Sequence, residues 1–499
     1  MLHRSNINGA NLDSRLQVDG SDFSPSADLS TRRHSPLRKW IAIPLFSAAL
    51  LMPCFWQSRI QAADLSSHIY NAWLASQIHQ GGAPGLWISP QSNNVLFDLV
   101  LEWLLVRIGP NAAQQVAVAA SVLVFGWGAL LFIFRAAGRN WWFAAPCVAM
   151  LSYGFIFHMG FFNFYLSMGL CLWYLAFFWD GPWRVRALSI PLLALAWLAH
   201  PFPVLWAVGV AAYITVANNF RPQRRFLALL LGLAVLLDAR YILTHRYSYS
   251  WSPRQFFFAA GANQIDLFGP KYMLPYSCLL FVWLLLLGKL LKRKPLADTV
   301  ATIPFQLWLL NAAAVFLIPS TVRFPQFGVP FGFITDRLSL ATALMLCAVL
   351  VTVPSSKIER FALALVAIVF FGLLYADDRG LNRLEDRIDA AIARLPPDQR
   401  VISTLPSLSL QSFCFHHELD RACIGHCFSY ANYEPSSRQF RIRARPDNGI
   451  VMDEYANVAK VESGVYVVRA SDVPVSLIYR CGLRDVCLHS LQVGDTVGN

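Results

Sequence analysis

An aspartate and a histidine lie one helical turn apart in the stretch ADLSSHIYNAWLASQIHQGG, residues 63–82. On a helix, Asp64 and His68 project from the same face, which also carries Asn71. A carboxylate with polar neighbours can serve as a general base for a hydroxyl group or as a metal ligand. We therefore predict Asp64 and His68 as catalytic residues. A plainer interpretation stays open, in which Asp64 caps the helix beside a surface histidine.

Further polar residues stand at the edges of apolar segments, and we predict that they bind the substrate or its phosphate. They are His158, Asn163, His200, His245, Arg323 and Arg337. Arg337 is the candidate anion clamp, because a guanidinium group matches phosphate oxygens bidentately. The loop before it, STVRFPQFGVPFGFITDR, adds aromatic surface. The alternatives are that Arg337 pairs with Asp336 or a lipid headgroup, and that each histidine merely anchors its segment at the membrane surface.

These residues belong to an apolar chain, since 56% of the 499 residues are hydrophobic and 14% are charged. An ordinary soluble domain carries about a quarter charged residues. Continuous apolar runs favour helices over a barrel, because helices satisfy their own backbone in lipid. We predict a mainly α, polytopic membrane protein. Its eleven predicted spans lie near 40–56, 112–134, 141–158, 163–180, 186–199, 202–218, 225–243, 273–290, 301–318, 334–353 and 358–376.

The basic residues set the predicted orientation. With the N-terminus in the cytoplasm, the inner segments hold nineteen Lys and Arg and the outer loops hold eight, as the positive-inside rule requires. This count needs residues 93–109, NNVLFDLVLEWLLVRIG, to lie on the outer surface as an amphipathic helix. Residues 64–80 form another helix in the same loop, ended by Gly81 and Gly82. The net charge of +12 thus reflects the orientation of the chain in the membrane. It does not indicate nucleic-acid binding, because the sequence contains no nucleic-acid-binding motif.

Three parts follow along the chain. We predict a disordered cytoplasmic tail (1–38), a transmembrane domain (39–376) and a soluble α+β domain on the outer side (377–499), with short strands such as VYVVR and VSLIYR. The predicted location is the inner (plasma) membrane, with the C-terminal domain periplasmic or extracytoplasmic. A cleaved signal peptide is the competing interpretation of the N-terminal region, but the charged lead is too long for one.

The C-terminal region concentrates cysteine and arginine. Close spacing in an oxidising compartment predicts the disulfides Cys423–Cys427 and Cys481–Cys487, with Cys414 left over. A zinc cluster is the less favoured alternative, because its spacing is irregular; it would use His416, His417, Cys423, His426 and Cys427. A basic stripe consists of Arg438, Arg441, Arg443 and Arg445, and the last three alternate along the chain as residues on one face of a strand do. The stripe either binds an anionic sugar or lipid headgroup or is solvated surface.

The order of these features resembles the GT-C class of membrane glycosyltransferases, of the type that uses polyprenyl-phosphate sugars. ADLSSHIYNAWLASQIHQGG is similar to the first outer loop of that class, and NNVLFDLVLEWLLVRIGPNAAQQVAV looks like its surface helix and second span. The resemblance covers residues 40–376. It implies transfer of a sugar, with inversion, from a polyprenyl-phosphate carrier to a glycan, lipid or protein acceptor, with Asp64 as general base. Many members carry paired acidic residues here, whereas Leu65 follows Asp64, which leaves a divalent cation open as cofactor.

Two other function classes fit the same pattern. One is a transporter or lipid flippase, and the other is a non-catalytic membrane protein with a glycan- or lipid-binding outer domain. Transporters usually show repeated halves and polar residues near the midplane, and here only Asp238 and Arg240 lie deeper. The absence of a glycine-rich phosphate loop and of a nucleophile elbow argues against ATP-driven pumps and serine hydrolases. The expected partners are the lipid-linked sugar, its acceptor and membrane lipid.

Overall fold

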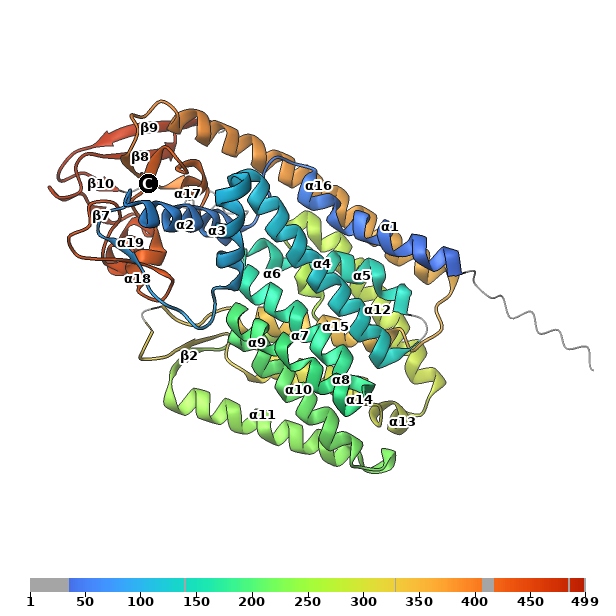
Figure 1. Ribbon diagram of the computed structural model, residues 1–499. Helices are drawn as coiled ribbons and strands as arrows, with labels where there is room; N and C mark the ends of the chain where they lie inside the picture. Colours follow the sequence, from blue (N-terminus) through green and yellow to red (C-terminus); the bar gives the residue numbers. More distant parts are fainter. Residues whose placement is uncertain (1–35, 139–140, 328, 406–416, 483–484, 498–499) are drawn as a thin grey trace, which may run out of the picture. The chain divides into compact units, whose positions relative to one another are not determined.

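The computed structural model describes residues 36–138, 141–327, 329–405, 417–482 and 485–497. The chain divides into two compact units, residues 1–46 and residues 47–499. Of the first unit, the structure describes the beginning of helix α1 (Pro36–Phe55), so the predicted disordered tail lies almost wholly outside the described residues. The second unit holds the remaining helices and strands (Figure 1).

Helices dominate the second unit, as predicted. Those of the apolar bundle are α4 (Pro110–Ala137), α5 (Ala145–Ser152), α6 (Phe155–His158), α7 (Phe162–Asp180), α8 (Trp183–Leu188), α9 (Ile190–Ala199), α10 (Pro201–Asn218), α11 (Phe226–Arg246), α12 (Met273–Arg293), α13 (Leu296–Val300), α14 (Ile303–Leu317), α15 (Ile334–Leu350) and α16 (Lys357–Ile392). Glycines let α4 and α7 approach closely: a Cβ on Gly128 would lie 2.7 Å from the carbonyl oxygen of Gly169. Such small residues are typical of helix contacts in membranes.

Seven helical segments within the described residues are long and apolar enough to cross a membrane. They are Pro110–Ala137, Trp141–His158, Phe162–Asp180, Pro201–Asn218, Pro222–Arg246, Pro270–Arg293 and Lys357–Ile392. Four predicted spans are shorter helices, namely the described apolar part of α1 (Ala42–Phe55), α9, α14 and α15. The coarse prediction of a mainly helical membrane protein is therefore confirmed. The count of eleven spans and their sidedness remain predictions.

The loop after α1 contains α2 (Ala63–Gln80), strand β1 (Leu86–Ile88) and α3 (Leu96–Ile108). Both predicted helices are thus confirmed, and α2 ends at Gly81, whose φ of 78° favours glycine. One side of α3 is buried, while apolar side chains are exposed on the other: Leu99, Val100, Trp103, Val106 and Ile108. This exposed face suits the predicted position at a membrane surface, which remains a prediction.

The C-terminal region centres on a four-stranded sheet in the order β5-β4-β8-β9. β4 (Gln399–Ser403) runs parallel to β5 (Cys427–Ser429) and β8 (Val475–Arg480), and β9 (Val486–Leu491) is antiparallel to β8. The smaller elements are α17 (Glu418–Ala422), α18 (Tyr433–Ser437), α19 (Tyr455–Glu462), β6 (Ile442–Ala444), β7 (Tyr466–Val467) and β10 (Thr496–Val497). Elsewhere β2 (Ser248–Ser250) pairs with β3 (Thr321–Arg323).

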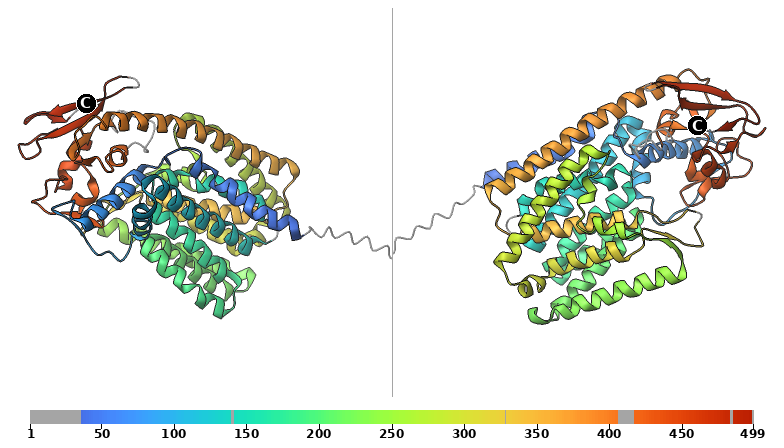
Figure 2. Two further views of the ribbon diagram at one scale, coloured as in Figure 1. Left: turned by 45° about the horizontal axis from the view of Figure 1, so that its top comes forward. Right: turned by 180° about the vertical axis from the view of Figure 1, so that it is seen from behind.

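The outer loop and the C-terminal region share one hydrophobic core. Tyr70 and Leu74 of α2 pack with Ile392 and Val401, and β1 pairs antiparallel with β6. Helix α16 has 36 residues, about 54 Å at 1.5 Å per residue, and it runs unbroken from the bundle into this region (Figures 1 and 2). Residue 377, the predicted start of a separate soluble domain, lies inside α16.

Both predicted disulfides, Cys423–Cys427 and Cys481–Cys487, are present. The zinc alternative is wrong for its two cysteines, because their sulfurs bond to each other; His416 and Cys414 lie outside the described residues. The basic stripe is also only partly solvated surface. Arg441 forms an ion pair with Glu102 of α3, so this arginine fastens the C-terminal region to the outer loop.

Candidate functional site

Asp64 lies in the first turn of α2. The N-cap residue is Ala62, so the interpretation of Asp64 as a helix cap is wrong. The backbone N–H of Asp64 donates to the carbonyl of Met159 at 3.3 Å. Gly160 approaches so closely that a Cβ there would lie 2.4 Å from the Asp64 nitrogen. The loop between α6 and α7 therefore fixes where α2 begins, and the Asp64 side chain stays 24% exposed.

His68, one turn further along α2, faces α3. Its Nδ1 lies 2.6 Å from one Asp98 oxygen, and the other Asp98 oxygen accepts a hydrogen bond from Asn163 Nδ2 at 2.8 Å. Asn163 is itself fixed, because its Oδ1 accepts the backbone N–H of Phe97 at 2.9 Å. Burial acts to lower the pKa of His68, but the charge and hydrogen bond of Asp98 prevail and raise this pKa to about 9. His68 is therefore an imidazolium at neutral pH.

A second imidazole reaches Asp64 from the C-terminal region. His417 Nε2 lies 3.6 Å from an Asp64 oxygen, and His417 Nδ1 lies 3.4 Å from an Asp420 oxygen. Burial acts to lower the pKa of His417, while the carboxylates of Asp420 and Asp64 raise it above the ordinary value. Asp64 thus contacts His417 and interacts electrostatically with His68, and each of these histidines pairs with a further aspartate, Asp420 or Asp98.

The segment at the start of α18, which also belongs to the C-terminal region, contacts α2 and His417. Asn432 Nδ2 donates to Asn71 Oδ1 at 2.8 Å, and the Tyr433 ring packs on His417 with centroids 5.0 Å apart. Glu434 is buried beside this pair. Burial, together with the negative charge of Asp98, raises the pKa of Glu434 above its ordinary value. The neutral form of Glu434 is therefore favoured more than in an exposed glutamate.

Arg337, the predicted anion clamp, is held by aromatic rings. The guanidinium carbon lies 4.5, 5.5 and 5.0 Å from three ring centroids, those of Phe161, Phe164 and Phe331. Its Nη1 donates to the carbonyl of Gly332 at 3.0 Å, and its Nε has no hydrogen-bond partner among the described residues. Within the same residues it forms no ion pair with Asp336, and it interacts electrostatically with both Asp64 and Asp336. This geometry leaves Arg337 donor capacity for an anion.

The other predicted binding residues divide into two groups. Asn163 joins the site through Asp98, and His200 stacks on Phe331 beside Arg337 while its Nδ1 accepts the N–H of Phe202. The remaining three are not brought to Asp64 by any described contact. His158 packs between aromatic rings, His245 is exposed near the end of α11, and Arg323 is exposed in β3.

Sequence reasoning missed several residues of this site. Asp98 lies in the predicted surface helix 93–109 but was not among the predicted site residues, and His417 was only an unfavoured zinc ligand. The remaining members were not predicted at all: Asp420, Asn432, Tyr433 and Glu434. One signal was present. Helix α2 is polar on several faces, and Ser66, Ser67 and Asn71 are nonetheless buried. A buried polar helix face needs polar partners, but the sequence does not say which segment supplies them.

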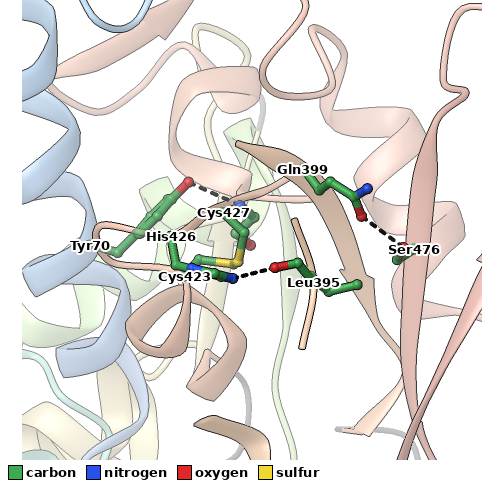
Figure 3. Close-up of a disulfide and its surroundings, with 8 residues drawn as sticks. Tyr70, Leu395, Gln399, Cys423, His426, Cys427 and Ser476 are labelled. Carbon is green, nitrogen blue, oxygen red and sulfur yellow. Dashed lines mark hydrogen bonds between the residues drawn. A yellow bond between two sulfur atoms is a disulfide. The ribbon is translucent and has the colours of Figure 1, made fainter. Parts of the chain in front are cut away.

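The disulfide Cys423–Cys427 fixes the segment that carries His417. It joins the end of α17 to β5, and Figure 3 shows Tyr70 of α2 reaching the same place. The Tyr70 hydroxyl oxygen accepts the N–H of Ser429 at 3.0 Å. Helix α2 and α17 are thereby held in register. Among the described residues, no group of three or more His, Cys, Asp or Glu is arranged to hold a metal ion.

Comparison of the chain with protein-family models, with curated proteins and with solved structures gave no match.

Proposed function

We propose that the protein is a membrane glycosyltransferase that moves a sugar from a polyprenyl-phosphate carrier to a hydroxyl acceptor, with Asp64 as general base. The observation that carries the proposal is the pair of histidines around Asp64. His417 contacts Asp64, His68 interacts with Asp64 electrostatically, and Asp420 and Asp98 hold the two imidazoles in place. A carboxylate in such a fixed setting can receive a proton without reorganising its surroundings.

The charges around Asp64 suit a phosphate leaving group. The imidazolium of His68 and the guanidinium of Arg337 both interact electrostatically with Asp64, so an anion beside Asp64 would meet two cations. Asp64 lies in the first turn of α2, in the loop that follows the apolar helix α1, and Arg337 lies in the first turn of the apolar helix α15. A lipid-linked phosphate lies at the same level, where headgroup and hydrocarbon meet.

In the proposed step, the acceptor oxygen attacks C1 of the sugar while the bond between C1 and the phosphate oxygen breaks. The acceptor proton passes to an Asp64 oxygen, and polyprenyl phosphate leaves with the bonding electrons. His68 and Arg337 offset the charge that develops on the phosphate. Attack from the face opposite the leaving group inverts the anomeric configuration.

The test is release of polyprenyl phosphate from a panel of polyprenyl-phosphate sugars by the purified protein in lipid vesicles, with candidate acceptors present. We expect turnover by the wild type and a loss of about 100-fold or more in Asp64→Asn, the usual scale of general-base catalysis. Asp298→Asn is the matched control, because Asp298 is exposed on α13 and far along the chain from the site.

Turnover by no member of the panel, or equal turnover by wild type and Asp64→Asn, would contradict the proposal. Uptake of the same lipid-linked sugars across the vesicle membrane would then become the next assay, because it tests the transporter alternative.

A further inference from the structure

Helix α11 is the least covered apolar helix of the bundle. It is a candidate span from Pro222 to Arg246, yet only 6% of its most apolar window is buried, compared with 67% for α4. Figure 1 shows α11 at the edge of the bundle, where it packs against α14 and α10. Most of its circumference therefore faces lipid or another protein.

The covered face of α11 is well defined. A Cβ on Gly232 would lie 2.9 Å from the Leu310 side chain of α14. Arg240, eight residues later and about 80° around the helix, donates to the carbonyl of Leu317 and stacks over the ring of Trp251. The charge of Arg240 is thus directed toward α14 and its neighbourhood.

Asp238 lies on the opposite face. At 100° per residue it is directed away from the side that carries Gly232 and Arg240. Asp238 is exposed and forms no hydrogen bond or ion pair with any residue that the structure describes. Its neighbours on this face, at spacings of three and four residues, are also exposed: Leu231, Val235 and Ile242. This spacing is the one used in helix–helix seams.

The position of Asp238 along α11 makes this arrangement unusual. The helix Phe226–Arg246 has its middle at residue 236, so Asp238 lies about 3 Å beyond the midpoint. The uncharged run before it, residues 226–237, covers only about 18 Å, whereas the hydrocarbon layer is about 30 Å thick. The membrane must therefore extend past Asp238. A short aspartate side chain at that depth cannot reach the headgroups and is costly without a partner.

We infer that the Leu231–Val235–Asp238–Ile242 face of α11 binds a transmembrane helix of another protein that carries a Lys or Arg near its middle. A second copy of this chain fits less well, because a parallel neighbour would present its own Asp238 at the same depth. Lipid alone leaves the carboxylate unpaired. The inference does not depend on the proposed enzymatic activity, since no described contact joins α11's exposed face to Asp64.

The experiment uses the full chain in vesicles of a zwitterionic lipid, labelled with an energy-transfer acceptor. The probe is a synthetic Leu/Ala helix of membrane-spanning length with one Lys at its middle, and the matched probe carries Leu there. We expect half-saturation at an about tenfold lower probe density for the Lys helix. This preference should vanish in Asp238→Asn and persist in Asp298→Asn, which changes an exposed aspartate outside the span.

Equal association of the two probes with wild type would overturn the inference, and so would a Lys preference that survives in Asp238→Asn. Energy transfer between differently labelled copies measures self-association of the chain through α11. Self-association that neither probe blocks would also overturn the inference. Thermal unfolding of Asp238→Asn at the wild-type temperature shows that a lost preference comes from the missing carboxylate.

Discussion

At the scale of residues, the site alternates between carboxylates and imidazoles. Asp98 holds His68, Asp64 contacts His417 and interacts electrostatically with His68, and Asp420 holds His417. Each imidazole is stabilised in its charged form by a carboxylate that faces it, despite burial. Protonation of these two histidines therefore controls the charge around Asp64.

His68 should make stability depend on pH. Its folded pKa of about 9 lies above the ordinary value of 6.5, so its contribution is full below about pH 6.5 and is lost as pH rises through 9. The shift corresponds to at most about 3 kcal/mol. We expect the imidazole carbon resonance of His68 to titrate near pH 9 and thermal unfolding to shift downward over this range.

Asp98→Asn is the control for this dependence. Without the carboxylate of Asp98, burial opposes only the smaller contributions of Glu434 and Asp64, and the pKa of His68 should fall toward or below the ordinary value. A His68 resonance that still titrates near pH 9 in Asp98→Asn would contradict the assigned cause.

At the scale of elements, the start of α2 depends on the loop between α6 and α7. Gly160 has φ 75°, and a Cβ there would lie 2.4 Å from the Asp64 nitrogen and 2.8 Å from the Leu65 nitrogen. Backbone atoms cannot swing aside as a flexible side chain can. The position of Asp64 therefore relies on glycine at residue 160.

Gly160→Ala should displace the first turn of α2 and cost about 2 kcal/mol or more, from left-handed backbone strain and overpacking. We expect a lower unfolding temperature and loss of any Asp64-dependent activity. Gly288→Ala in α12 is the matched control, because nothing lies within 4 Å of its added Cβ. Equal unfolding temperatures for the two variants would refute the role of Gly160.

The elements show where sequence patterns suffice. Apolar runs and glycine signals predicted α2, α3 and the long spans, because backbone satisfaction in lipid and helix termination are local effects. Short spacing predicted both disulfides. The pairing of β1 with β6 and the approach of His417 to Asp64 were not predictable, since both join segments far apart in the sequence. Arg441 looked like free surface for the same reason, as its partner Glu102 lies on α3.

At the scale of the whole molecule, a buried ionic contact joins the C-terminal region to the outer loop and α16. Arg421 donates to Glu385 at 3.1 Å and to the carbonyl of Ile60 at 3.0 Å. Gln61 donates to the same Glu385 at 2.8 Å. Because Arg421 belongs to α17 and Ile60 precedes α2, this contact holds His417 and Asp64 at a fixed separation.

Arg421→Met should leave Glu385 with only the longer ion pair to Arg59, at 3.4 Å, and destabilise the protein by at most about 3–5 kcal/mol, the cost of a broken buried ion pair. We expect faster limited proteolysis between α16 and β5. Arg135→Met is the control, because Arg135 pairs with Asp180 at an exposed position, where a pair contributes about 1 kcal/mol or less. Similar proteolysis rates for the two variants would contradict the claim that the Arg421–Glu385 contact joins the C-terminal region to α16.

If Asp64 takes the acceptor proton, its loss should slow sugar transfer itself, and this is measured as the single-turnover rate of Asp64→Asn. The assay uses excess protein in lipid vesicles with a donor that the wild type turns over. We expect an inverted product from the wild type and a rate at least about 100-fold lower for Asp64→Asn, with Asp298→Asn unchanged. An Asp64→Asn rate within about twofold of the wild type, well inside that 100-fold scale, would contradict the claim.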